Sequence, residues 1–350
     1  WPNIPLQGID PLFAGIWLIG GGCALAGAWM AKYHRLAALT LIGGTGIITA
    51  ATFLWLSAPD LALTQLMVET VTTVLILLGL RWLPPRIEST DEPEMATRGV
   101  WLRRARDLAV AVAGGGALAA LTYAVLVHPA SDTIADFFLL NALEGGGGSN
   151  VVNVLLVDFR SFDTLGEITV LAVVALTVYA LLRRFRPAPE SVGVPMQQRH
   201  DADPARGQTP AEQADSGYLM VAGIYLRLLL PFMGVIAVYF FMRGHNLPGG
   251  GFIAGLVAAS AAVMLALAFG VGRARAVLPL PPVALLATGL AVAAGAGVIG
   301  LVQGQAFLTG NWIFPAGLAL GTPLLFDVGV FLTVLGAVLH MLFRLLAREA

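Results

Sequence analysis

The chain has 350 residues, of which 57% are hydrophobic and 12% charged, and its formal net charge is −1. Soluble globular domains carry roughly 25% charged residues, so this composition indicates a polytopic membrane protein. The near-zero net charge gives no argument for a nucleic-acid partner, and the single cysteine, Cys23, excludes an intrachain disulfide and a thiolate metal site. No basic region or cleavage site follows Trp1, so we expect no signal peptide.

Nine stretches are close to the roughly 20 apolar residues that a bilayer-spanning helix needs. In chain order, the predicted spans are residues 11–31, 36–57, 61–83, 107–128, 163–183, 218–242, 250–270, 283–303 and 323–346. When Lys32 and Arg35 are placed inside, the alternation of spans places all but three of the 20 Lys and Arg residues inside or at an inner helix end. The three exceptions are Arg160, Arg227 and Arg243. The positive-inside rule therefore predicts an outside N-terminus and an inside C-terminus.

Two segments between the spans organise the chain. Residues 129–162 contain the string GGGGSN, and they are predicted to form a short amphipathic helix, a flexible glycine turn and an interfacial or re-entrant segment on the outer side. A pair of true spans there would also preserve the topology. Residues 187–217 are rich in Pro, Ala, Gln, Asp and Arg, which predicts a cytoplasmic linker. The predicted fold is thus an all-α transmembrane bundle with a five-helix module (1–186) and a four-helix module (218–350).

The third span carries an acidic residue, Glu69, where a charge costs on the order of 2.5–3.5 kcal/mol even on a lenient scale. Gln65 precedes it by four residues, and Thr72 and Thr73 follow it by three and four, which makes a polar stripe at helical spacing. The stripe is interpreted as a site where Glu69 handles a proton or a cation, or as interhelical hydrogen bonding around a protonated acid. Asp60 follows Pro59 at the helix start, so it is either a helix cap or a second site residue.

Five further polar residues lie in or near the predicted spans. Glu167 is either an outer-side carboxylate on the same ion route as Glu69 or an interfacial acid favoured by the helix dipole. Asp327 and His340 lie thirteen residues apart on one helix, which puts them on opposite faces, so they cannot form one site. Arg227 is explained by snorkelling or by a transport role, and His245 lies in a glycine-rich turn with possible ion contact. His340 is either a proton-transfer group or a structural histidine.

No cofactor is expected. The five histidines have no close His or Cys neighbours, which argues against a transition-metal site, and no pair of histidines within the spans could hold haem. The glycine runs do not match a phosphate-binding loop, and no soluble catalytic site is present, so we expect a transporter component rather than an enzyme.

Three motifs resemble one family. APDLALTQLMVETVT at 58–72 and NVVNVLLVDFRSFDTLGEITVL at 150–171 resemble the C-terminal part of the large A subunit of the Mrp (also called Mnh or Pha) monovalent cation/proton antiporters. RGHNLPGGGFIAGL at 243–256 resembles the hallmark of their B subunit. The resemblance therefore implies an A–B fusion joined by the 187–217 linker.

The resemblance implies a component of a bacterial cell-membrane complex that exchanges Na⁺ or K⁺ for H⁺, with large proton-channel subunits and small membrane subunits as partners. Glu69 and Glu167 match acids considered important in the family, and Asp60 falls in the same motif. Glu69 would bind a transient Na⁺ through carboxylate, hydroxyl and amide oxygens. The family's lysine-bearing antiporter helices are not in this sequence, so we expect no complete proton route in it. The alternatives are a structural scaffold within such a complex and the membrane module of a redox-driven ion pump related to complex I or membrane-bound hydrogenase.

Overall fold

The computed structural model describes residues 10–31, 34–80, 98–127, 133–184, 220–278, 280–313 and 320–346. Nine helices in these ranges are long and apolar enough to cross a membrane, which confirms the nine predicted spans. They are α1 (Pro11–Met30), α2 (Arg35–Trp55), α3 (Pro59–Leu80), α4 (Arg98–Val127), α7 (Ser161–Arg184), α11 (Met220–Arg243), α12 (Gly251–Val277), α13 (Pro282–Val302) and α14 (Thr322–Leu346). The predicted 187–217 linker lies outside the described residues, and the orientation and the two-module division remain predictions.

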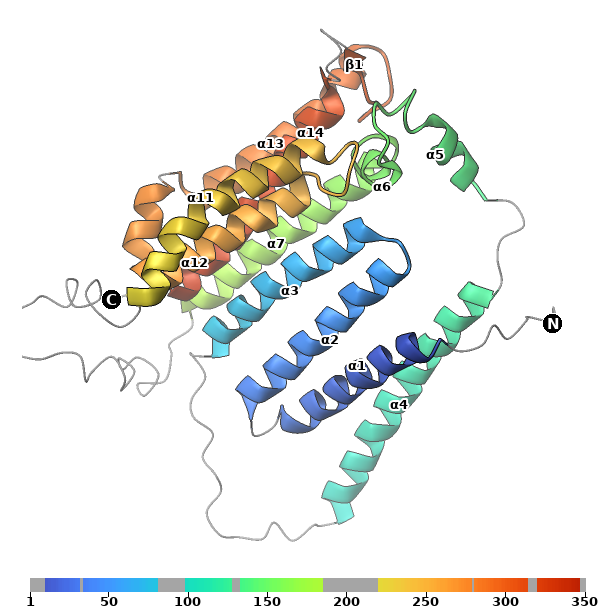
Figure 1. The fold of residues 1–350 in the computed structure, drawn as a ribbon, viewed down its shortest axis with the longest axis vertical. Coiled ribbons are helices and arrows are strands. Elements are labelled where there is room, and N and C mark those ends of the chain that lie inside the picture. Colours follow the sequence, from blue (N-terminus) through green and yellow to red (C-terminus); the bar gives the residue numbers. More distant parts are fainter. Residues whose placement is uncertain are drawn as a thin grey trace, which may run out of the picture.

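The core is built around α14. In an apolar 18-residue stretch of this helix, 72% of the residues are buried, against 61% for α12 and 39% for α13. Four of its side chains are at most 1% exposed: Phe326, Val334, Leu339 and Leu342. The helices α12 and α13 lie beside α14, as do α3 and α7 from the earlier part of the chain, and α11 packs against α12 (Figure 1). The largest hydrophobic cluster accordingly joins side chains such as Val71 and Ile168 to α12 and α14. The core thus extends across both predicted modules.

The first four helices bury much less of their surface. Asp10 caps α1 by accepting hydrogen bonds from the backbone of Leu12 and Phe13, and Pro11 at the first turn suits that helix start. The helices α1, α2 and α3 pack in succession, and α3 joins them to α12 (Figure 1). None of the α4 residues whose burial is described is buried. In a membrane, these apolar faces are available to lipid or to partner proteins.

The segment before α7 is short and tightly packed. It contains α5 (Ala135–Asn141), α6 (Val151–Val154) and a π-helical turn, η1 (Leu155–Phe159), none of which is long enough to span a bilayer. The predicted flexible glycine turn is instead held by close contacts. Gly147 has a φ of +67°, and a Cβ there would lie 2.8 Å from the Trp312 ring, while a Cβ at Gly148 would lie 2.3 Å from the His245 carbonyl oxygen. The glycines permit this close approach, so the turn docks onto the α11–α12 loop.

One small departure from an all-helical chain occurs between α13 and α14. The strands β1 (Trp312–Ile313) and β2 (Leu320–Gly321) pair in antiparallel fashion, with Trp312 opposite Gly321. This hairpin places Trp312 against both the glycine turn and the α11–α12 loop, where its ring meets that of His245 at 5.0 Å.

Candidate functional site

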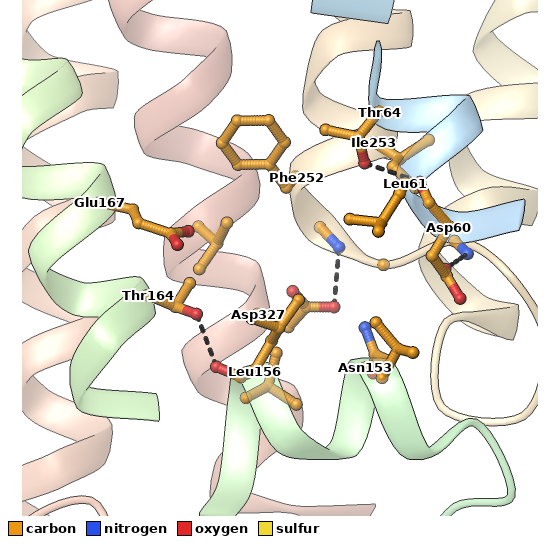
Figure 2. Close-up of a pocket in the computed structure, with 16 residues that line it drawn as sticks. Asp60, Leu61, Thr64, Asn153, Leu156, Thr164, Glu167, Phe252, Ile253 and Asp327 are labelled. Carbon is orange, nitrogen blue, oxygen red and sulfur yellow. Dashed lines mark hydrogen bonds between the residues drawn. The ribbon is translucent and has the colours of Figure 1, made fainter. Parts of the chain in front are cut away.

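A cavity of about 230 Å³ lies at the junction of the two predicted modules. We call it the seam cavity, because it is lined by α3, α6, η1 and α7 of the first predicted module and by α12 and α14 of the second (Figure 2). Its walls are mainly apolar, and its polar side chains are those of Asp60, Thr64, Asn153, Thr164, Glu167 and Asp327. Three acidic residues that are more than 100 positions apart in the sequence therefore line one space.

Asp60 connects α3 to two other segments. Its Oδ1 accepts a hydrogen bond from the Gly249 amide at 3.0 Å, and its Oδ2 accepts one from Asn150 Nδ2 at 3.1 Å. The same Asn150 amide group also donates to the carbonyl oxygens of Gly244 and Leu247, at 3.0 and 3.1 Å. Asp60 therefore lies in the cavity wall, and the hydrogen-bond partners of its carboxylate come from outside its own helix.

Asp327 is the most deeply buried acid of the cavity. Its side chain is only 2% exposed, and its Oδ2 accepts a hydrogen bond of 2.8 Å from the Gly251 amide. Gly251 is the first residue of α12, where the amide groups lack helical partners and the helix dipole favours a negative charge. The N-terminus of α12 therefore holds this carboxylate in place.

Asn153 adds an unpaired oxygen to the same wall. The residue is 5% exposed, and its Oδ1 accepts no hydrogen bond from any described residue. Its Nδ2 faces Gly250, where a Cβ would lie 2.5 Å away. A buried amide oxygen normally has a partner, and water or a hard cation would supply one here. No three His, Cys, Asp or Glu side chains in the described ranges are grouped to hold a metal ion, so such a cation would have mixed oxygen ligands.

Glu167 lies at the more open side of the seam cavity. Its side chain is exposed on α7, and Figure 2 shows the carboxylate pointing into the space beside Asp327. One turn earlier, Thr164 Oγ1 donates to the Leu156 carbonyl oxygen at 2.7 Å, which fixes η1 against α7. The cavity thus has an accessible acid on one side and a buried acid on the other.

Glu69 belongs to a separate cluster between α2 and α3. Gln65 Nε2 donates to its Oε2 at 3.4 Å, and Thr73 Oγ1 donates to its Oε1 at 3.5 Å. The carboxylate lies against Gly46 of α2, where a Cβ would be 2.2 Å from Oε2. Thr72 does not join this cluster, contrary to the predicted stripe, because it is exposed and its hydroxyl bonds the Val68 carbonyl oxygen at 2.7 Å. Nine residues separate Asp60 from Glu69, or about 13 Å along the helix.

Three residues that the sequence offered as weaker ion-path candidates lie away from the seam cavity. His245 packs edge-on against Trp312, and burial lowers its pKa to about 4, so the imidazole is neutral at pH 7. The Arg227 guanidinium lies 5.7 Å from the Phe269 ring centroid, and the ring of His340 lies tilted against that of Tyr179, with the centroids 5.4 Å apart. The ion-path roles of these three residues remain predictions, and the structure does not bring their side chains together at one site. Asp327, the fourth of the weaker candidates, does line the seam cavity.

Three charged residues near the start of α7, Asp158, Arg160 and Asp163, do not form one cluster in the structure. Arg160 pairs with Asp163, but Asp158 instead accepts a hydrogen bond from Trp312 Nε1 at 3.0 Å. Burial raises the pKa of Asp158, and its hydrogen bonds to Trp312 and to the Gly310 backbone partly oppose that rise. Asn153 was missed by sequence reasoning; its polarity within the apolar run VVNVLLV was the available signal.

Three family models match successive parts of the chain. The model of the D subunit of MBH matches residues 20–85, and that of the E subunit of MBH matches 102–199. The third, described as "Domain related to MnhB subunit of Na+/H+ antiporter", matches residues 221–340. Together they cover both sides of the seam cavity.

Individual relatives and a solved structure agree with these matches. The A/B subunit of a probable K(+)/H(+) antiporter of Rhizobium meliloti (strain 1021) is 46% identical over 98% of this chain and 35% of its own length. The A subunit of the Na(+)/H(+) antiporter of Bacillus subtilis (strain 168) is 40% identical over 43% of this chain and 18% of its own. A chain in the structure of the Mrp complex from Dietzia sp. DQ12-45-1b superposes with a TM-score of 0.80 at 31% identity, over 99% of this chain and 36% of that one. This chain, which spans about a third of the A/B relative's length, therefore belongs to the Mrp antiporter family and combines parts similar to the family's A and B subunits.

Proposed function

We propose that this chain is a membrane component of a multisubunit antiporter that exchanges Na⁺ or K⁺ for H⁺, and that it contributes part of the ion path. The observation that carries the proposal is the meeting of Asp60, Glu167 and Asp327 in one cavity beside the unpaired oxygen of Asn153. The names of its relatives support the cation and the proton as substrates. We further propose a bacterial inner-membrane location, with partner subunits covering apolar faces such as that of α4.

The chemistry of the seam cavity suits alternating occupancy. A carboxylate in an environment of low dielectric constant is stable only when a proton or a cation neutralises it, and the two compete for the same oxygens. Glu167 is accessible and would exchange ions first, whereas Asp327 would hold an ion with help from Asn153. Because either ion excludes the other, such competition couples the two fluxes.

The Glu69 cluster supplies a second candidate position on the same helix as Asp60. Gln65 and Thr73 present an amide and a hydroxyl to the carboxylate at distances of 3.4 and 3.5 Å. Both hydrogen bonds are long, so the carboxylate is not tightly satisfied and retains lone pairs for a proton or a cation. An ion would travel about 13 Å along α3 between the two positions.

A scaffold function is the second candidate, and one observation favours it. Asp60 and Asp327 both accept backbone hydrogen bonds from the 249–251 turn, so each has a structural reason to be acidic. In that case the acids hold α3, α12 and α14 together and carry no ions. Glu167 separates the two functions, because its carboxylate makes no hydrogen bond to a described residue.

The test measures Na⁺- and K⁺-dependent proton exchange in everted vesicles that carry the complete complex. Glu167→Gln and Glu69→Gln keep the side-chain shape and remove the titrating group. With normal assembly, we expect exchange to fall at least tenfold in either variant, while Asp136→Asn, an exposed acid on α5, leaves it unchanged. Full exchange in both glutamine variants would establish the scaffold function instead.

A further inference from the structure

A second and larger cavity lies at the opposite end of α14 from Asp327. Its volume is about 500 Å³, within the range of roughly 300–1,000 Å³ typical of ligand pockets. It forms where α12 ends, α13 begins and α14 approaches its last turn, about 20 Å along α14 from Asp327. The predicted orientation places this end on the inner side of the membrane. The proposed ion exchange does not involve it.

The polar lining of this inner cavity is basic. Arg275, His340 and Arg344 line it, and no acidic residue is among its lining residues in the described part of the chain. Arginines in the last turns of α12 and α14 also compensate the helix dipoles and follow the positive-inside rule. Those two explanations account for the charges but not for a cavity between them.

The two guanidinium groups are held by aromatic rings. Arg275 lies 5.4 Å from the centroid of Phe343, and Arg344 lies 4.3 Å from that of Tyr179. Stacking uses the face of a guanidinium, and a planar guanidinium presents N–H donors along its edge in a geometry that matches phosphate oxygens. The arrangement therefore favours an anion with several oxygen atoms.

His340 lines the same cavity beside the two arginines. The residue is 5% exposed and its ring lies tilted against that of Tyr179, yet its Nε2 has no hydrogen-bond partner among the described residues. A buried and unpaired imidazole nitrogen beside a basic cavity is accounted for when a bound group supplies the missing partner.

The remaining walls are apolar. They include Pro281, Pro282 and Phe343, and the nearby rim residues Leu280 and Val283 are 59% and 46% exposed. An acyl chain would cover these exposed side chains, whereas a small free anion would leave them uncovered. Basic pockets between transmembrane helices on the cytoplasmic side suit anionic lipid headgroups.

We propose that the inner cavity binds a phosphate group, and that the phosphodiester headgroup of an anionic phospholipid is the form that its apolar rim fits. The phosphate oxygens would accept hydrogen bonds from Arg275 and Arg344, and His340 would complete the site. The acyl chains would leave the cavity over Leu280 and Val283.

The test measures lipid bound to the complete purified complex by native mass spectrometry after incubation with phosphatidylglycerol, with phosphatidylcholine or with inorganic phosphate. The double variant Arg275→Gln/Arg344→Gln removes both guanidinium groups. The matched control is Arg273→Gln, because Arg273 lies on the same helix end, over Phe269 at 5.7 Å, and does not line the cavity. We expect affinity for phosphatidylglycerol to fall roughly fivefold for each cavity arginine removed and to stay unchanged in the control.

The result that overturns the phosphate site is equal phosphatidylglycerol retention in the double variant and in Arg273→Gln, with no arginine-dependent binding of inorganic phosphate. Arginine-dependent binding of inorganic phosphate without lipid retention would keep the site and overturn its lipid assignment. If the double variant fails to assemble, the single variants Arg275→Gln and Arg275→Lys decide the question. Weaker lipid retention in Arg275→Gln than in Arg275→Lys supports the site, and equal retention overturns it.

Discussion

Replacing Gly46 by alanine adds a methyl group in space that the Glu69 side chain occupies. A Cβ at position 46 would lie 2.2 Å from Oε2, 2.4 Å from Cδ and 2.8 Å from Cγ of Glu69, whereas ordinary contacts begin near 3.4 Å. The carboxylate must therefore retreat by about 1 Å or more, and it loses hydrogen bonds to Gln65 and Thr73 that are already 3.4 and 3.5 Å long. Because these atoms belong to the outer part of a flexible side chain, the side chain can move away at little cost in stability.

The functional loss should exceed the loss of stability. A displacement of about 1 Å at a reacting group can reduce its effectiveness roughly 100-fold, so we expect Gly46→Ala to lower cation-dependent proton exchange at least tenfold in vesicles with normally assembled complex. The control is Gly43→Ala on the same helix, where a Cβ would lie 3.7 Å from Oε1 in ordinary contact. Wild-type exchange in Gly46→Ala would refute the assignment of Glu69 to the ion path.

Three further predictions concern the end of the bundle that is predicted to face outward. Gly147→Ala forces an alanine into a φ of +67° and its methyl group to within 2.8 Å of the Trp312 ring, so we expect thermal unfolding to show a loss of about 1–3 kcal/mol. The control Gly114→Ala, in the interior of α4 with nothing within 4 Å, should not destabilise the protein. Asn150→Ala removes the hydrogen bonds to Asp60, Gly244 and Leu247. The backbone amides of residues 244–250 should therefore exchange hydrogen faster in this variant than in the control Asp136→Asn. Equal exchange in the two variants would contradict these contacts. Burial in the folded state lowers the pKa of His245 to about 4, against 6.5 for the free side chain. The neutral side chain is compatible with folding above pH 6.5, whereas protonation favours the unfolded state as the pH falls toward 4. The resulting loss of stability is at most about 3 kcal/mol. After correction for the intrinsic exchange rate, which itself falls with pH, the protection factors of the amides at 244–250 should therefore decrease between pH 6.5 and 4 in the wild type and decrease less in His245→Gln.

The features that the sequence predicted are those that depend on helical periodicity. Nine apolar stretches of sufficient length predicted the nine spans, and the i, i+4 spacing of Gln65, Glu69 and Thr73 predicted one cluster. Thr72 lies apart from this cluster, because its side chain is exposed and its hydroxyl donates to the Val68 carbonyl oxygen instead. The opposite positions of Asp327 and His340 followed from the same periodicity, and the two residues line different cavities.

The features that the sequence missed depend on contacts between distant segments. Nothing in the local pattern brings Asp60, Asn153, Glu167 and Asp327 together, because the packing of α3 and α7 against α12 and α14 does so. The four glycines at 145–148 suggested flexibility, since composition does not show that Trp312 and the His245 carbonyl lie against them. Nothing in the local sequence indicates that Asp158 accepts a hydrogen bond from Trp312, more than 150 residues later.

A high-resolution cryo-EM structure of the complete complex in rubidium chloride would show whether the seam cavity holds water and cations. Rubidium resembles K⁺ and scatters electrons more strongly than water does. We expect density inside the cavity within bonding distance of Asp327 and of Asn153 Oδ1, with a path of water leading to Glu167. A dry cavity in which Asn153 and Asp327 bond only to protein groups would overturn the proposed ion path and support the scaffold function.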